Sequence, residues 1–221
     1  LWYGAHLPLV ASGAWRISQP FHDLLWSPRF RMAAYQLLGG PCRFLHDQIF
    51  CKPAAARCPQ SWFGFHQDLY YWSWTTPMAH LTCWVALDDA TEDNGCLQYV
   101  PGSHRWGLLP DIPADAEPAI DAVNKVLSPE QRQAVANAER VPLRKGMASF
   151  HHPLTLHGSG SNATTRPRRA VALNTILDGT RSNYELMPPP GKFPFIPQGQ
   201  PLGRSGHQND RFYPLLLGDP A

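Results

Sequence analysis

Prolines and glycines interrupt this chain so often that it has little room for long helices. The 221 residues include 23 prolines and 17 glycines, the residue types that most often end or turn regular structure. Between them lie short apolar segments of strand-like composition, the strongest at residues 42–53, 77–90 and 168–177. Short strands separated by turns, with a few helices near the front of the chain, predict an antiparallel double-sheet roll with supporting helices.

Helix and turn signals add detail to this β-rich pattern. Residues 28–38 and 128–140 have helical character, and in the second segment Ser128 can cap the helix while Pro129 occupies its first turn. The Asn94–Gly95 pair precedes the strand-like "CLQYV" and is typical of the tight turn in a β-hairpin. We therefore expect a hairpin at this turn.

Size, charge and cysteine usage narrow the class of protein. No repeat or clear linker divides the chain, so we expect a single domain over residues 1–221, with upstream residues missing if Leu1 is not the natural start. A net charge of +2 without a dense basic run argues against a nucleic-acid surface, and no apolar run reaches the about 18 residues of a membrane span. Five cysteines without CxxC spacing favour a reducing, cytoplasmic setting.

The segment "FHQDLYYW", residues 65–72, places a histidine and a carboxylate two positions apart in an aromatic, strand-like run. Residues i and i+2 of a strand point to the same face, so His66 and Asp68 are expected to share one. A buried carboxylate is costly unless a positive charge lies against it. We interpret the pair as two ligands of a metal ion.

A second segment, residues 151–170, supplies further imidazoles. One of them, joined with the His66 and Asp68 pair, would complete the facial triad of non-haem Fe(II) oxygenases, which leaves coordination positions open for a co-substrate and O₂. We choose His157, because a hydroxyl and an arginine follow it two and eleven residues later. The alternatives in this segment are His151 and His152.

The arginine and the hydroxyl after His157 suggest what binds beside the metal. Arg168 can form a bidentate pair with a carboxylate, and Ser159 can add a hydrogen bond. This anchor suits a dicarboxylate such as 2-oxoglutarate, whose keto-acid end would chelate the metal while Arg168 holds the other end. Strand alternation places Arg169 on the opposite face, whereas Arg166 shares the face of Arg168 and remains an alternative.

At this point the chain resembles a known family, the phytanoyl-CoA dioxygenase (PhyH) family of Fe(II)/2-oxoglutarate-dependent oxygenases. The matching pieces are "HQD" at 66–68, "AHLTCWVALDDATEDNGCLQYVPGSHRWG" at 79–107, and "HGSGSN" with "RPRRA" between 157 and 170. The resemblance covers most of residues 40–217. A lone HxD occurs by chance, but these motifs in this order are a specific signal.

The resemblance implies both a fold and a set of site residues. The fold is mainly β, a double-stranded β-helix (jelly-roll, cupin-like) core with supporting helices. The implied iron ligands are His66, Asp68 and His157. The implied 2-oxoglutarate contacts are Arg168, Ser159, Trp84, Gln48 and Lys52. Related chlorinating enzymes have a small residue in place of the triad carboxylate, so Asp68 indicates oxygenation rather than halogenation.

Substrate contacts are less constrained by the sequence. Tyr70 and Trp72 directly follow the first two ligands and are candidates, although aromatic residues in such runs are more often part of the wall. His80 shares a strand face with Trp84 and either lines the cavity or simply packs.

These observations lead to a functional hypothesis. We expect a dioxygenase that uses Fe(II), 2-oxoglutarate and O₂ to oxidise, above all by hydroxylation, a C–H bond of a small-molecule metabolite, with release of succinate and CO₂. Natural-product biosynthesis is one setting for such a reaction. We expect neither a nucleic acid nor a membrane as a partner. The alternative is a cupin-like metal-binding protein without oxygenase activity, either an isomerase or a ligand sensor.

Overall fold

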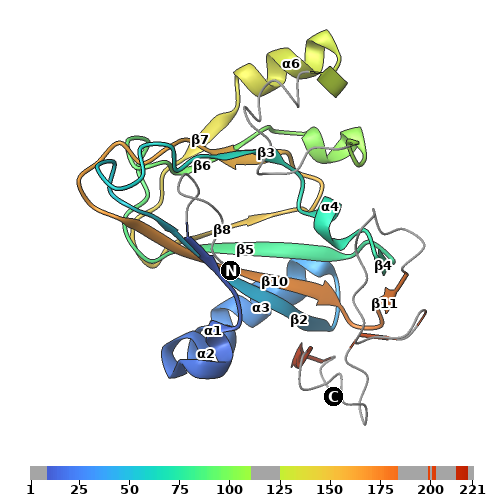
Figure 1. Cartoon of the computed structure of the whole chain (residues 1–221). Coiled ribbons are helices and arrows are strands. Elements are labelled where there is room, and N and C mark those ends of the chain that lie inside the picture. Colours follow the sequence, from blue (N-terminus) through green and yellow to red (C-terminus); the bar gives the residue numbers. More distant parts are fainter. Residues whose placement is uncertain (1–8, 111–124, 184–198, 200, 203–212, 219–221) are drawn as a thin grey trace. The chain divides into compact units, whose positions relative to one another are not determined.

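The regular structure of the protein consists mainly of two β-sheets (Figure 1). The computed structural model describes residues 9–110, 125–183, 199, 201–202 and 213–218. Within these residues one sheet has six strands in the order β1-β2-β10-β5-β8, with β12 also paired to β2. Its strands are β1 Leu9–Ala11, β2 Cys42–Lys52, β5 His80–Ala86, β8 Ala148–His151, β10 Arg168–Leu177 and β12 Leu215–Leu217.

The other large sheet is antiparallel and has the strand order β3-β9-β6-β7. Its strands are β3 Phe63–His66, β6 Leu97–Tyr99, β7 Glu139–Val141 and β9 His157–Ser159. A two-stranded sheet pairs β4 Thr75–Thr76 with β11 Arg181–Ser182. The mainly β, jelly-roll class predicted from the sequence is confirmed by this architecture and by the solved structure compared below.

The chain divides into two compact units. As far as the residues are described, the first unit contains β1 with residues 49–70 and 84–171, and the second contains residues 12–48, 71–83 and those from 172 onward. Strands β2, β5 and β10 contribute residues to both units. The expectation of a single domain over the whole chain stays a prediction.

In the first unit, helix α6 Pro129–Ala136 packs beside the four-stranded sheet through a buried apolar cluster. The cluster comprises Val100, Leu109, Leu127, Val135 and Leu156. The helix begins as predicted: Ser128 accepts a hydrogen bond from the backbone of Gln131, whose side chain accepts one from the Ser128 backbone, and this capping box satisfies two donors at the helix start. A short 3₁₀ helix, Ser103–Trp106, precedes the cluster residue Leu109.

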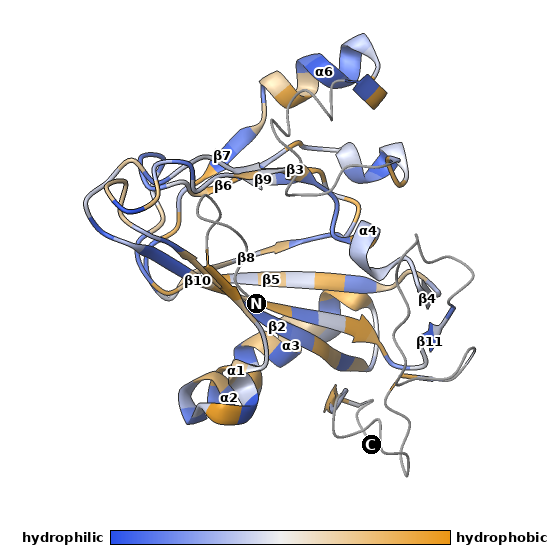
Figure 2. Cartoon of the chain, viewed as in Figure 1, coloured by the Kyte–Doolittle hydropathy of each residue, from blue (hydrophilic) through white to orange (hydrophobic). Residues whose placement is uncertain are grey.

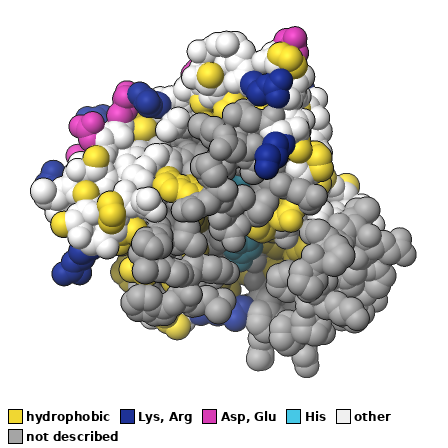
Figure 3. All heavy atoms as spheres, turned by 45° about the horizontal axis from the view of Figure 1, so that its top comes forward, with side chains coloured by type: hydrophobic (Ala, Val, Ile, Leu, Met, Phe, Trp, Pro, Cys, Tyr) yellow, Lys and Arg dark blue, Asp and Glu magenta, His cyan; other side chains and the backbone are white. Residues whose placement is uncertain are grey.

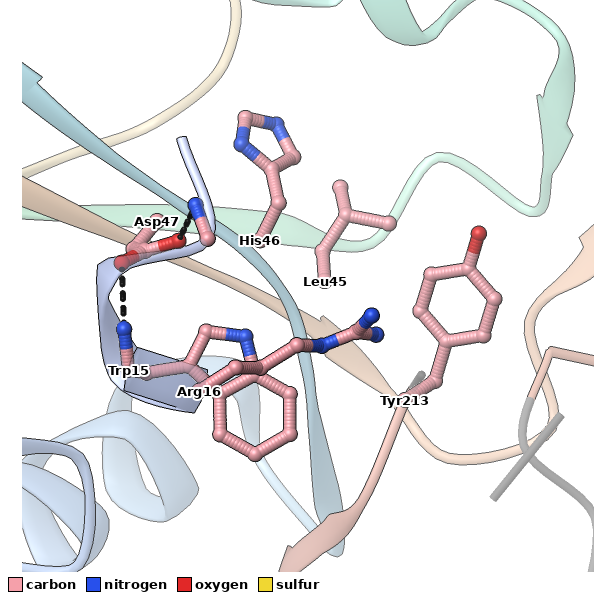
Figure 4. A pocket seen from close by; sticks show the side chains of 7 residues that line it. Trp15, Arg16, Leu45, His46, Asp47 and Tyr213 are labelled. Carbon is pink, nitrogen blue, oxygen red and sulfur yellow. Dashed lines mark hydrogen bonds between the residues drawn. The ribbon is translucent and has the colours of Figure 1, made fainter. Parts of the chain in front are cut away.

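The second unit contains the N-terminal helices. These are α1 Ala14–Ile17, α2 Gln19–Leu25 and α3 Pro28–Leu38. Helix α3 follows the predicted bounds and ends at Gly39, whose positive φ of 78° suits glycine. Asp47 on β2 fastens α1 by accepting hydrogen bonds from the backbone of Gly13 and Trp15, at 2.6 and 3.0 Å, beside a small pocket that Arg16 and Tyr213 also line (Figure 4).

The burial of the central strands follows their composition. All seven residues of β5 are buried, and so are all but two of the ten residues of β10. Figure 2 shows hydrophobic stretches along both strands. On the face drawn in Figure 3, the described Lys and Arg side chains are scattered rather than gathered into one basic patch. Among the described helices, none combines the length and apolar character that crossing a membrane requires.

Two local predictions are wrong. Residues 65–72 do not form one strand, because β3 ends at His66 and helix α4, Leu69–Trp72, begins three residues later. The predicted hairpin is absent, because β6 pairs with β7 and β9 of the four-stranded sheet, while the preceding strand β5 lies in the other sheet. The turn itself forms, with Gly95 at a φ of 79°, but it directs the chain from one sheet to the other.

The apolar cluster gives a stability prediction. Leu156 is fully buried next to His157, so Leu156→Ala should lower the free energy of unfolding by about 2–5 kcal/mol through lost burial and an unfilled cavity. Leu37→Ala is the matched control, because Leu37 is 59% exposed and should change stability by less than about 0.5 kcal/mol. Urea denaturation followed by tryptophan fluorescence measures both values, and equal costs would contradict the packing described here.

Candidate metal and co-substrate site

The three residues predicted as metal ligands, His66, Asp68 and His157, converge in the first unit. The register of β3 and β9 pairs His66 with His157, and their ring centroids are 4.3 Å apart. Oδ1 of Asp68 lies 3.7 Å from Nε2 of each ring. One donor atom from each of the three residues lies within 4.8 Å of the others, which is close enough for a single metal ion to bind all three.

The two imidazoles are oriented by the backbone. Nδ1 of His66 lies 2.8 Å from the carbonyl of Gly64, and Nδ1 of His157 lies 2.8 Å from the carbonyl of Thr155. A carbonyl only accepts, so each Nδ1 carries the proton and each Nε2 presents its lone pair. Burial lowers the pKa of both rings, which favours the neutral form that a metal requires.

The carboxylate completes a donor set of the kind that iron binds. Burial alone would raise the pKa of Asp68, but the imidazoles of His157, His151 and His66 together hold it well below its usual range. Asp68 is therefore an anionic acceptor beside two neutral imidazoles. Two imidazoles and one carboxylate on one side of an ion fit the coordination chemistry of Fe(II) and leave other positions open.

Gln67, between the two ligands, explains how Asp68 reaches the site although it is not on the strand. Its buried side chain donates to the carbonyls of Gly107 and Leu154, at 2.9 and 2.8 Å, and accepts from the backbone of Leu109 at 2.7 Å. These three bonds fix the chain where it leaves β3. Sequence reasoning missed this role, and the only signal was the position of Gln67 inside the motif.

The alternative ligands have other contacts in the structure. His151 places Nε2 2.9 Å from Oδ2 of Asp68. His152 accepts a hydrogen bond from the backbone of Leu154 at 3.1 Å, and its ring lies 5.6 Å from that of His104. Neither belongs to the group of three converging donor residues.

Two buried basic side chains lie in the same unit. Arg168 is 1% exposed, donates to the carbonyl of Gly95 at 2.8 Å, and places its guanidinium carbon 5.2 Å from the ring centroid of Trp84. Its Nε atom is buried without a hydrogen-bond partner in the described part of the chain. Arg166 and Arg169 are both exposed, and Arg169 pairs with Asp88 at 2.8 Å.

Lys52 is the second of these side chains and is fully buried. Its Nζ donates to Oγ of Ser159 at 2.6 Å and to the carbonyl of Gly160. Burial, together with the charge of Arg168, lowers the pKa of Lys52 well below its usual value. Within the described residues neither Lys52 nor Arg168 pairs with a carboxylate, and a buried charge without a counter-ion is costly. A bound carboxylate would supply that counter-ion, so these residues fit the distal end of 2-oxoglutarate.

The other predicted contacts are divided between the units. Tyr70 lies in the first unit on α4 and is half-buried. Trp72 and His80 lie in the second, where their rings stack with centroids 5.3 Å apart. Gln48 also lies in the second unit and accepts a hydrogen bond from Asn174 at 3.4 Å. Their predicted roles as co-substrate or substrate contacts stay predictions.

Comparison with known proteins identifies the family. The sequence profile described as Phytanoyl-CoA dioxygenase (PhyH) matches residues 8–170. The chain belongs to the phytanoyl-CoA dioxygenase family. Its resemblance to this family, predicted from the motifs, is thus confirmed, and iron and 2-oxoglutarate are the metal and co-substrate of the class.

Individual relatives differ in reaction. Human peroxisomal phytanoyl-CoA dioxygenase is 33% identical over 130 residues, which cover 58% of this chain and 37% of the human protein. Methylphosphonate hydroxylase of Gimesia maris is 34% identical over 159 residues, 71% of this chain and 55% of that protein. The chain thus spans less than two thirds of the length of these two relatives.

A solved structure shows the same fold with ligands bound. The epimerase SnoN from nogalamycin biosynthesis, in complex with Fe³⁺, α-ketoglutarate and nogalamycin RO, is 27% identical with a TM-score of 0.67. The match covers 94% of this chain and 78% of SnoN. The proteins that this chain resembles are thus named for different reactions, hydroxylation in one and epimerisation in another.

The packing around Lys52 leads to a second stability prediction. A Cβ added at Gly95 would overlap the carbonyl oxygen of Gly160 and lie 3.0 Å from Nζ of Lys52, whereas a Cβ at Gly102 would meet nothing within 4 Å. Both glycines have a φ near 78°. Gly102→Ala should therefore show only the left-handed strain of about 1–2 kcal/mol, and Gly95→Ala should add about 1–3 kcal/mol of overpacking. Urea denaturation compares the two, and equal losses would exclude the tight contact at Gly95.

Proposed function

We propose that this chain is a non-haem Fe(II)/2-oxoglutarate-dependent dioxygenase that hydroxylates a C–H bond of a small-molecule metabolite. The observation that carries the proposal is the presence, in one unit, of a triad of metal donors and of a pair of buried basic side chains that have no carboxylate partner among the described residues. His66, Asp68 and His157 would hold the iron. Arg168, Ser159 and Lys52 would hold the distal carboxylate of 2-oxoglutarate.

The chemistry itself belongs to the bound groups. When bound, iron and 2-oxoglutarate supply an oxidant from O₂, with one oxygen atom ending in succinate and the other in the hydroxylated substrate while CO₂ is released. The protein residues orient and shelter this reaction. The triad would hold one side of the metal, and the carbonyls of Gly64 and Thr155 keep its two imidazoles in a fixed orientation.

The co-substrate end of the site is organised by hydrogen bonding. Lys52 donates to Oγ of Ser159, which leaves the hydroxyl proton of Ser159 free to be donated to a bound carboxylate. Trp84 packs against the guanidinium of Arg168 and restricts its orientation. Because Arg168 and Lys52 are buried, their attraction for a carboxylate is less screened than it would be in water.

Hydroxylation is the outcome that we propose among those known for such folds. Methylphosphonate hydroxylase, a relative 34% identical to the chain over 159 residues, supports this reaction type. Tyr70, Trp72 and His80 remain the proposed substrate contacts. The cytoplasm remains the compartment that we expect.

The first functional prediction concerns turnover of the co-substrate. Anaerobic addition of Fe(II) and 2-oxoglutarate should produce a weak visible charge-transfer band, and exposure to O₂ should release succinate. Asp68→Ala should lose both signals, because the metal loses its only anionic protein ligand. Asp23→Ala, which alters a carboxylate that is 65% exposed in the second unit, should keep both. A wild-type protein that binds Fe(II) and 2-oxoglutarate but releases no succinate would contradict the oxygenase assignment.

The second functional prediction concerns the anchor. Arg168→Gln should raise the 2-oxoglutarate concentration for half-maximal succinate release by roughly 30-fold or more, because losing one partner of a buried charge pair costs about 2–5 kcal/mol. Affinity for Fe(II) should be unchanged. Arg169→Gln is the matched control, since this neighbouring side chain is 56% exposed. An unchanged 2-oxoglutarate requirement in Arg168→Gln would show that the anchor lies elsewhere.

A further inference from the structure

We propose that His151 is a positioning residue that holds the metal-binding carboxylate of Asp68 in place. The inference rests on the proposed metal centre and adds a residue outside its triad. The two oxygens of Asp68 have different surroundings. Oδ1 lies 3.7 Å from Nε2 of both His66 and His157, whereas Oδ2 lies 2.9 Å from Nε2 of His151.

This division of the two oxygens matters for an open metal site. A carboxylate can bind a metal through one oxygen or through both. A hydrogen bond from His151 occupies Oδ2 and leaves Oδ1 for the metal, so that Asp68 would take a single coordination position. Hydrogen bonds to a ligating carboxylate also fix its orientation before the metal arrives, which strengthens binding.

A hydrogen-bond chain sets the orientation of His151 in turn. The hydroxyl of Tyr99 lies 3.2 Å from Nδ1 of His151 and 2.9 Å from Oγ of Ser149. An ionised carboxylate only accepts, so Nε2 of His151 donates to Asp68. In the neutral ring Nδ1 then accepts, so Tyr99 donates to His151 and itself accepts from Ser149. One direction of donation therefore runs from Ser149 to the metal ligand.

The secondary structure places these groups opposite one another. Ser149 and His151 lie two residues apart on β8 and share a face. Tyr99 lies on β6 in the register position opposite His157, and its ring is 5.3 Å from that of His151 and 5.9 Å from that of His157. Tyr99 thus contacts a triad ligand and the positioning residue at once. This chain of hydrogen bonds links β8 of the six-stranded sheet with β6 of the four-stranded sheet, both within the first unit.

A test uses the metal alone as the probe, so that it does not depend on the substrate. Co(II) reports its coordination through visible absorption and can be titrated into metal-free protein without 2-oxoglutarate. His151→Phe removes the donor and keeps a planar ring. It should weaken Co(II) binding about tenfold or more, the usual effect of losing a hydrogen bond to a metal ligand. The Co(II) spectrum at saturation should stay that of the wild type, because the three ligands remain.

Two further variants separate positioning from general structure. His151→Gln keeps an N–H donor near Nε2 and should restore affinity to within about threefold of the wild type. Tyr99→Phe removes only the hydroxyl that bonds to Nδ1 of His151, and it should lower the affinity for Co(II) less than His151→Phe does. His104→Phe is the matched control, because its ring contacts His152 rather than Asp68, and it should keep wild-type affinity.

The outcomes that would overturn the proposal are distinct from failure of the metal centre. If wild-type protein binds no Co(II), the metal centre itself is wrong. If wild-type protein binds Co(II) and His151→Phe binds it equally well, the positioning role is wrong. An altered spectrum at saturation in His151→Phe would make His151 a ligand instead. Equal weakening by Gln and Phe would assign the effect to packing. Where His151→Phe fails to fold, Tyr99→Phe decides, because unchanged Co(II) affinity in that variant would contradict the hydrogen-bond chain.

Discussion

The close approach of strands β3 and β9 is the contact on which the rest of the site depends. A Cβ at Gly158 would lie 2.9 Å from the carbonyl oxygen of Phe63 and 3.1 Å from the backbone of Gly64, so only glycine permits this spacing. The spacing brings His66 opposite His157. It also explains the form of the "HGS" motif, in which His157 and Ser159 share one face of β9 and the glycine between them meets the neighbouring strand.

Strand β9 joins the two halves of the proposed active site, the metal centre and the basic anchor. His157 is one of the proposed metal ligands. Ser159, two residues later on the same strand, accepts a hydrogen bond from Lys52, one of the two basic side chains of the anchor. The spacing between the two is set by the rise of a β-strand rather than by flexible loops. A ligand that bridges a metal and a basic anchor must match this fixed separation. A short dicarboxylate such as 2-oxoglutarate has a carboxylate at each end for these two positions.

The sequence predicted the parts of this arrangement that depend on local patterns. The capped helix after Ser128 and the helix at residues 28–38 follow from side chains close in sequence. The triad and the anchor were predicted from residue types and their spacing together with the resemblance to a family, although the strand assumed for residues 65–72 was wrong. Residues 65–72 look strand-like through their aromatic composition, but the three hydrogen bonds of Gln67 end the strand at His66.

Long-range contacts account for what the sequence could not show. The turn at Asn94–Gly95 forms as its residues predict, but the partner of the strand after it is chosen by tertiary packing. His151 was considered only as a rival ligand, since its contact with Asp68 joins residues that are 83 positions apart. No periodicity or spacing rule marks such a pair.

The buried charges of the proposed complex gain counter-ions only when both ends are filled. Asp68 and the keto-acid carboxylate would together neutralise a divalent metal. The distal carboxylate would supply the counter-ion that the buried Arg168 and Lys52 lack among the described residues. Burial and the charge of Arg168 lower the pKa of Lys52, as expected where a buried positive charge is uncompensated. Binding a carboxylate at this end therefore offsets a cost that the two basic side chains otherwise carry.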